Sequence, residues 1–230
     1  MKAVILAGGL GTRLRPLTQI IPKPLLPVGE KSLLEITILN LKRFGFDEVI
    51  LATNYKSDLF ESYFGDGSKF GIKVTYSKEK EPLGTAGPLL LVKDKLTEPF
   101  LVMNGDILTN LDFSKLIGFH KTNSADFTVV SKIIEHPLHY GVVKAEDSRV
   151  TAIEEKPVIE SEINAGIYAL SPVALSRIPE NRFFTMTELI KSLISNRNKV
   201  LRYKLDDYWL DIGQMSDYKK AQDDIKQGLV

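Results

Sequence analysis

The chain of 230 residues contains no cysteine and only three histidines, His120, His136 and His139. Disulfide-stapled scaffolds are therefore excluded, and so is a zinc site built from thiolate and imidazole ligands. Any metal must be a hard cation held by carboxylates, and magnesium is the first candidate. A chain of this length buries about 70% of its unfolded surface, so it can form a stable core without disulfide bonds or a structural metal.

An excess of charge of either sign is also missing, since 30 Lys and Arg face 29 Asp and Glu. The chain therefore lacks the excess of positive charge that sequence-independent binding to nucleic acid requires. No apolar run approaches the roughly 18 residues of a membrane span, and the N-terminal segment is too short and too polar for a secretory signal. We expect a cytoplasmic protein that binds small ligands, with no nucleic acid and no membrane among its partners.

The first half of the chain alternates short β-rich runs with helical patterns. This alternation predicts an α/β fold with a mixed, mostly parallel central sheet covered by helices on both faces, and ligands at the carboxyl ends of the strands. The predicted strands are 2–7, 48–53, 73–77, 100–103 and 126–132, and the predicted helices are 32–44, 57–64, 85–96 and 113–121.

After residue 140 the pattern changes to hairpin-like stretches, followed by two more helices. We predict strands at 140–145, 150–155, 164–170 and 200–205, and helices at 186–196 and 216–227. No linker, repeat or low-complexity tract separates the two halves, so one domain over 1–230 is expected.

A glycine cluster follows the first strand directly. Gly8, Gly9 and Gly11 let backbone N–H groups approach a phosphate, and Thr12 and Arg13 add a hydroxyl and a planar cation. The dinucleotide fingerprint and the Walker A loop do not fit these residues. Lys23 lies ten residues beyond Arg13, between two prolines. The prolines restrict the backbone, so the positive charge of Lys23 is held in a fixed position.

Eight segments in this order resemble the sugar-1-phosphate nucleotidylyltransferases. They are MKAVILAGGLGTRLRPLT (1–18), PKPLLPVGEKSLLE (22–35), EPLGTAGPL (81–89), NGD (104–106), YGVV (140–143), EEKP (154–157), NAGIY (164–168) and WLDIG (209–213). The family joins an NTP to a sugar 1-phosphate, releasing pyrophosphate, on a Rossmann-like three-layer core with Mg²⁺. Its guanylyltransferases that make GDP-mannose are the most similar.

The resemblance implies the following division of roles. Residues 1–110 would bind the nucleotide and residues 111–230 the sugar phosphate, and a homodimer stays open. Asp106 and Asp211 would hold Mg²⁺, and Arg13, Lys23 and Asp106 would be catalytic. The implied nucleotide-binding residues are Leu6, Ala7, Gly8, Gly9, Gly11, Thr12, Arg13, Glu81, Gly84 and Thr85.

Glu81 favours guanine as the base. A carboxylate only accepts hydrogen bonds, and guanine offers two adjacent donors, whereas thymine and uracil are met better by an amide. GTP is therefore the expected substrate, and UTP or dTTP is the alternative.

The sugar 1-phosphate is implied to lie on Gly141, Glu155, Lys156, Asn164 and Gly166. A hexose, a hexosamine and a heptose all remain open as the sugar. Long members of the family continue into a β-helix of hexapeptide repeats, which this sequence lacks; it resembles a short form or a domain cut from a longer chain. A catalytically silent nucleotide-sugar sensor or regulatory subunit is the alternative from another class, although Arg13, Lys23, Asp106 and Asp211 argue against it.

Overall fold

A computed structural model describes residues 1–54 and 56–230. Its centre is a seven-stranded sheet in the order β12-β8-β11-β6-β1-β4-β5, in which β11 runs antiparallel to both of its neighbours and the other pairings are parallel. The prediction of a mixed, mostly parallel sheet is confirmed. The strands are β1 (Lys2–Leu6), β4 (Glu48–Thr53), β5 (Lys73–Lys78), β6 (Phe100–Asn104), β8 (Phe127–Pro137), β11 (Val158–Leu170) and β12 (Val200–Lys204).

Helices cover both faces of the sheet. Side chains alternate along β1, so Ala3 and Ile5 join one core cluster and Val4 joins the other. The first cluster is closed by α2 (Leu33–Arg43), α3 (Ser57–Phe64) and α4 (Phe113–Thr122), and the second by η4 (Gly87–Lys95), η5 (Pro172–Arg177) and α5 (Met186–Ser195). None of the helices in the described part of the chain has the length and apolar character needed to cross a membrane.

The helix predicted over 32–44 forms as α2 for local reasons that the sequence carries. The Ser32 hydroxyl accepts a hydrogen bond from the Glu35 backbone at 3.2 Å and caps the first turn. Leu34, Ile38 and Leu41 then form a fully buried stripe at helical spacing.

The segment predicted as a helix over 85–96 is instead the 3-10 helix η4. Its buried residues Leu89 and Val92 lie three positions apart, which is the period of a 3-10 turn. The sequence also gave no sign of several short elements, namely η1 (Thr12–Leu14), α1 (Leu17–Ile20), η2 (Lys23–Leu25), β2 (Pro27–Val28), β3 (Lys31–Ser32), η3 (Ser68–Phe70), β7 (Ile107–Thr109) and β13 (Trp209–Asp211).

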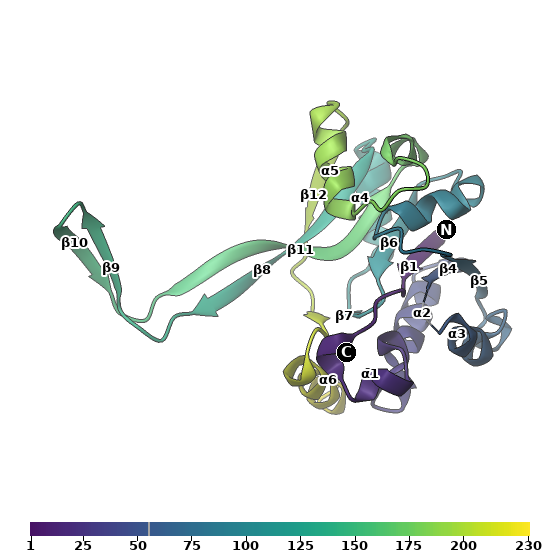
Figure 1. The fold of residues 1–230 in the computed structure, drawn as a ribbon, viewed down its shortest axis with the longest axis horizontal. Coiled ribbons are helices and arrows are strands. Elements are labelled where there is room, and N and C mark those ends of the chain that lie inside the picture. The colour runs from purple at the N-terminus through teal and green to yellow at the C-terminus, as the bar shows by residue number, and fades with distance from the viewer. Residues whose placement is uncertain (55) are drawn as a thin grey trace.

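The second half of the chain adds a long β arm and a final helix. Strands β8 and β11 run beyond the sheet as a two-stranded ribbon, and β9 (Val142–Glu146) and β10 (Arg149–Glu154) form a hairpin at its far end (Figure 1). Helix α6 (Met215–Lys226) packs against β2 and β13 and lies near α1, at the end of the body opposite α5 (Figure 1).

Candidate active site

The glycine cluster forms the loop after β1 as predicted. The Ala7 backbone donates to Ala52 on β4 at 2.8 Å, which extends the parallel pairing to the edge of the loop. Gly11 has φ +59, and a Cβ there would lie 2.9 Å from the methyl group of Thr18, so only glycine fits this turn. The Thr18 hydroxyl also donates to the Gly11 carbonyl at 2.7 Å and fixes the loop.

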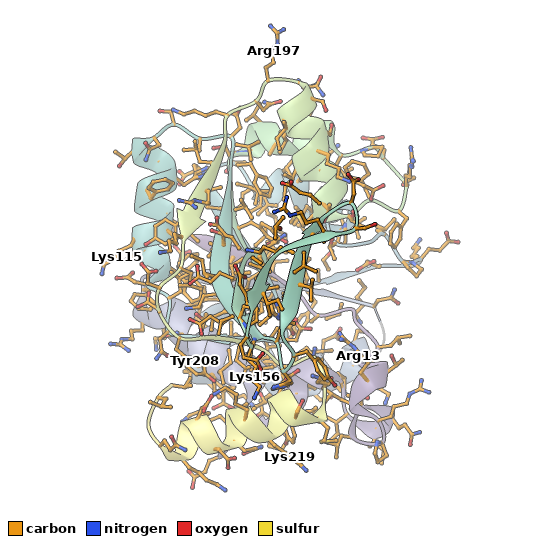
Figure 2. All side chains as sticks on the ribbon, turned by 90° about the vertical axis from the view of Figure 1, so that its left-hand side faces the viewer. Arg13, Lys115, Lys156, Arg197, Tyr208 and Lys219 are labelled. Atoms are coloured by element: carbon orange, nitrogen blue, oxygen red, sulfur yellow. The ribbon has the colours of Figure 1, made fainter. Side chains whose placement is uncertain are left out.

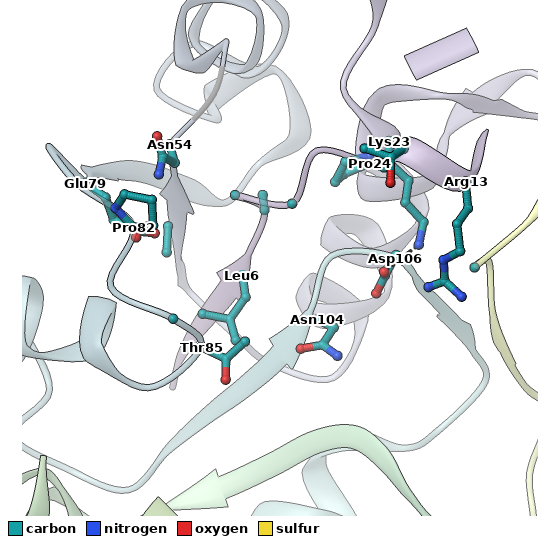
Figure 3. A pocket seen from close by; sticks show the side chains of 18 of the residues that line it. Leu6, Arg13, Lys23, Pro24, Asn54, Glu79, Pro82, Thr85, Asn104 and Asp106 are labelled. Carbon is teal, nitrogen blue, oxygen red and sulfur yellow. Dashed lines mark hydrogen bonds and ion pairs between the residues drawn. The ribbon is translucent and has the colours of Figure 1, made fainter. Parts of the chain in front are cut away.

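A pocket of about 490 Å³ opens above this loop, at the carboxyl ends of β1, β4 and β6. Its volume is within the usual range for small-ligand sites. Figure 3 shows Arg13, Lys23 and Asp106 at one end and Glu79, Pro82 and Asn54 at the other. Predicted residues that line it are Leu6, Ala7, Gly8, Gly9, Gly11, Thr12, Arg13, Lys23, Gly84, Thr85 and Asp106.

The two aspartates converge because of strands that the sequence did not reveal. Asp106 follows β6, and β7 begins at the next residue. Strand β13 pairs antiparallel with β7 and places Asp211 opposite Ile107. The Ile212 backbone also donates to the Asp106 carbonyl at 3.0 Å. Two segments about a hundred residues apart are thus hydrogen-bonded side by side in a small two-stranded sheet that follows the carboxyl end of β6.

Lys23 bridges these two carboxylates. Its ammonium nitrogen lies 2.5 Å from an Asp106 oxygen and 3.8 Å from an Asp211 oxygen, with the lysine side chain only 9% exposed. Those oxygens are therefore at most about 6.3 Å apart, the sum of the two distances. Burial raises the pKa of Asp211, the nearby Asp106 charge raises it further, and the cations of Lys23 and Arg13 oppose both effects.

Arg13 approaches the site beside β13. Both of its terminal nitrogens lie 3.5 Å from the position that a Cβ on Gly213 would take, which is ordinary van der Waals contact, so the guanidinium lies directly against this glycine. Asp217 on α6 fixes this stretch of backbone, because its carboxylate accepts from Gly213 at 3.1 Å and from Gln214 at 2.9 Å. The position of Arg13 thus depends on the cap of α6.

At the other end of the pocket, the acidic residue that lines the wall is Glu79, whereas Glu81 is exposed and lies outside the set of lining residues. The Leu83 backbone donates to Glu79 Oε2 at 2.8 Å. Glu79 Oε1 faces the glycine loop, 3.5 Å from a Cβ built on Gly8. Burial raises the pKa of Glu79, and the Leu83 hydrogen bond partly offsets that rise.

The loop behind Glu79 is fastened to the start of α5. Gly84 has φ +81, and a Cβ there would lie 2.6 Å from the Phe184 carbonyl oxygen. That carbonyl accepts from Ala86 at 2.9 Å, and the Thr85 hydroxyl accepts from the Met186 backbone at 2.7 Å. Thr85 therefore holds the wall of the pocket in place through its side chain.

Sequence reasoning missed the pocket residues Pro24, Ala52, Asn54, Glu79, Pro82, Asn104, Phe183 and Gly213. A signal for Glu79 was available. It is the first residue after β5, and its backbone continues the parallel pairing by donating to Thr53 at 3.1 Å. The first residue past a parallel strand faces the ligand edge, and Glu81 lies two residues further into the loop.

The predicted sugar-phosphate residues are divided between two places. Asn164 and Gly166 lie at an irregularity in the β8–β11 ladder, where Gly166 has φ +69 and a Cβ would lie 2.7 Å from Asn104 Nδ2. The Asn164 amide is used within this turn, accepting from Gly166 and donating to the Tyr168 hydroxyl, each at 2.9 Å. Neither residue lines the pocket, although their neighbour Asn104 does.

Gly141, Glu155 and Lys156 lie on the β arm and are exposed. A Cβ on Gly141 would lie 3.0 Å from Glu155 Oε2, so these two residues are adjacent as the resemblance implies. None of the three lines the pocket of the body. The structure thus keeps the group together but places it away from Asp106.

No cluster of three or more histidine, aspartate or glutamate side chains that could hold a metal is found in residues 1–54 and 56–230. Asp106 lines the pocket beside Lys23 and Arg13, whereas Asp211 lies outside the set of lining residues, 3.8 Å from the Lys23 ammonium. Together the two carboxylates supply hard oxygen ligands at this end of the pocket. Mg²⁺ in phosphate chemistry is bound by one or two carboxylates, with substrate phosphates and water supplying the rest. This pair has the donor chemistry for such an ion.

The nucleotidyl transferase family model matches residues 2–228. The chain belongs to the nucleotidyl transferase family. It is 41% identical over 227 residues to mannose-1-phosphate guanylyltransferase 1 of Arabidopsis thaliana, with 95% of this chain and 63% of the relative covered. It is 39% identical over 225 residues to mannose-1-phosphate guanylyltransferase catalytic subunit beta of Dictyostelium discoideum, covering 95% of this chain and 62% of that one. The chain thus spans less than two thirds of the length of these relatives.

Crystal structures of HddC from Yersinia pseudotuberculosis match over nearly the whole of both chains. One has a TM-score of 0.77 at 30% identity and covers 97% of this chain and 99% of that one. A second, complexed with GMP-PN, also gives a TM-score of 0.77, at 29% identity and with the same coverage. The Rossmann-like architecture predicted for the family is confirmed.

Proposed function

We propose that the chain is an Mg²⁺-dependent guanylyltransferase that joins GTP to a sugar 1-phosphate and releases pyrophosphate. The observation that carries the proposal is the phosphate end of the pocket, where Lys23 contacts both Asp106 and Asp211 beside Arg13 and the glycine loop. The guanylyltransferase names of the relatives support GTP over UTP or dTTP, and so does the GMP-PN complex of HddC. The name "catalytic subunit" of one relative argues against a silent regulatory role.

Mg²⁺ held by Asp106 and Asp211 would neutralise charge on the phosphates. The chain's own residues do the positioning. The backbone N–H groups of the glycine loop face the triphosphate, and Arg13 adds a planar pair of donors for phosphate oxygens. Lys23 holds a buried positive charge where the reacting phosphates meet.

In the proposed reaction an oxygen of the sugar phosphate attacks the α-phosphorus of GTP. A new P–O bond forms in line with the bond to the β-phosphate, which breaks, and pyrophosphate leaves with that electron pair. A phosphate monoester is already ionised at neutral pH, so no side chain needs to remove a proton. The site must instead hold two anions together, which agrees with the absence of histidine from its lining.

Base recognition is assigned to Glu79 in this proposal, in place of the predicted Glu81. Leu83 fixes one carboxylate oxygen of Glu79, while the other faces the glycine loop. An ionised carboxylate accepts from the adjacent N1–H and N2 amino donors of guanine. The sugar, a hexose, hexosamine or heptose, is assigned to Gly141, Glu155 and Lys156. Asn164 and Gly166 take part through Asn104, which lines the pocket and lies against Gly166.

Pyrophosphate release tests the proposal. Purified protein is assayed with GTP, UTP and dTTP against mannose, heptose and glucosamine 1-phosphates, with and without Mg²⁺ and EDTA. We expect turnover with GTP that EDTA abolishes and Asp106→Asn reduces. Preference for UTP or dTTP would support the alternative base, and nucleotide-sugar binding without turnover would support the silent subunit.

A further inference from the structure

The β arm is attached to the body only through its own two strands. The ladder between β8 and β11 continues outward through seven consecutive register pairs, from Asn164 with Ser131 to Val158 with Pro137. Within residues 1–54 and 56–230, no hydrogen bond or ion pair joins 133–161 to the body. Figure 1 shows the arm extending away from the sheet, and in Figure 2 it points towards the viewer.

The hairpin at the end of the arm has one apolar face. Val143 is paired with Ile153, and Ala145 with Val150, so these four side chains share a face. Val143, Val150 and Ile153 are 57%, 56% and 67% exposed. The opposite face carries the ion pair between Lys144 and Glu154. Isolated two-stranded hairpins are marginal in water, so this apolar face indicates a surface that packs against protein.

The arm and the rest of the chain carry opposite net charge. Residues 133–161 contain six acidic and three basic side chains, a net charge of −3. The remaining residues contain 27 basic and 23 acidic side chains, a net charge of +4. The arm is therefore attracted to a body of this same chain.

The arm also carries chemistry that the pocket needs under the proposed function. Gly141, Glu155 and Lys156 are the residues assigned to the sugar phosphate, yet they lie outside the pocket of their own body. Folding the arm back onto that pocket would bend or break the paired ribbon at its base. Reaching a second body leaves the ladder intact.

We propose that two copies of the chain exchange their β arms, so that Glu155 and Lys156 of each copy complete the sugar-phosphate site of the other. The apolar face of the hairpin packs on the body of the second copy. Such an exchange is reciprocal, and a two-fold axis satisfies both arms at once. The shared site depends on the proposed function, whereas the interface does not.

Measurement of mass in solution tests the interface without any activity assay. We expect the wild-type chain to have twice the chain mass by light scattering. Ile153→Glu puts a charge on the apolar face and should give a monomer. Ala152→Glu adds the same charge at the neighbouring position on the opposite face and should leave the dimer intact. A monomeric wild type, or a dimer that withstands Ile153→Glu, would overturn the proposal.

Mixed dimers test the shared site. A Lys23→Ala chain and a Lys156→Ala chain, each nearly inactive alone, are co-expressed with different tags and purified as a heterodimer. One of its two sites then has a normal pocket and a normal arm, so we expect about half of the wild-type turnover per dimer. A heterodimer no more active than its parents would show that each arm serves its own pocket. Full activity of Lys156→Ala alone would show that this lysine does not bind the sugar phosphate. Either result rejects the shared site.

A separate outcome distinguishes the two proposals. A dimer that dissociates with Ile153→Glu but never releases pyrophosphate supports the arm interface and rejects the proposed function.

Discussion

Replacing Glu79 with glutamine changes the hydrogen-bonding character of the pocket wall while keeping its shape. The Leu83 backbone donates to one carboxylate oxygen at 2.8 Å, so the glutamine carbonyl would take that place. The amide NH₂ group would then occupy the position of Oε1, which faces the glycine loop. A group that only accepted hydrogen bonds becomes one that donates them.

The size of the effect follows from the number of contacts at stake. A good bidentate contact to a base contributes about 1–3 kcal/mol of discrimination, which corresponds to roughly 5- to 150-fold in relative use, at about 1.4 kcal/mol per tenfold. The glutamine NH₂ group would oppose the guanine donors and match a carbonyl of thymine or uracil. Glu79→Gln should therefore lower kcat/KM for GTP relative to dTTP by about 10- to 100-fold.

Pyrophosphate release with each nucleotide in turn measures this ratio. Glu81→Gln is the matched control, because it makes the same chemical change two residues away on an exposed side chain. Its effect should stay within about 0.5 kcal/mol. An unchanged nucleotide profile in Glu79→Gln, or a larger change in Glu81→Gln, would refute the assignment of the base to Glu79 and restore the prediction made from the sequence.

Three further predictions concern the phosphate end and the core. Lys23→Ala should keep its circular dichroism spectrum but lose about 10²- to 10³-fold in kcat, as on removal of a preorganised donor, whereas Lys80→Ala, an exposed lysine, should not. Asp217→Ala and Asp112→Ala both remove a helix cap, and each should lower the free energy of unfolding in urea by about 1 kcal/mol. Only Asp217→Ala should also lower kcat/KM, because Asp217 fixes the backbone beside the Arg13 guanidinium. Burial lowers the pKa of His120 below its usual 6.5, so at lower pH the unfolded chain binds a proton that the native state does not. The free energy of unfolding should therefore fall as the pH is lowered from about 7.5 to about 5.5. His120→Gln should reduce that fall.

The sequence was informative where local chemistry determines structure. The strand period of β1 and the capped apolar stripe of α2 are visible in the residues themselves, and both elements form close to their predicted ranges. The glycine loop was also predictable, because only glycine tolerates the turn at Gly11. These features depend on few neighbours.

The remainder depends on contacts between distant segments. Strands β7 and β13 have three residues each and exist because they pair with each other, so neither has a pattern of its own. Glu79 and Glu81 lie in one run of alternating charges, and only the end of β5 decides which of them faces the pocket. The length of the arm also depends on pairing between distant segments, because the residues of the hairpin do not determine how far β8 and β11 remain paired.

The charges at the phosphate end argue for a cation that arrives with the substrate. Lys23 and Arg13 supply two formal positive charges, and Asp106 and Asp211 supply two formal negative ones, so the formal charges of these four side chains cancel. A nucleoside triphosphate and a sugar 1-phosphate bring several more negative charges into the same volume. The four side chains alone cannot neutralise that excess, and Lys23 is already shared between two carboxylates. A divalent ion bound by the aspartates and the phosphates would reduce the repulsion and release Lys23 to contact the reacting phosphates.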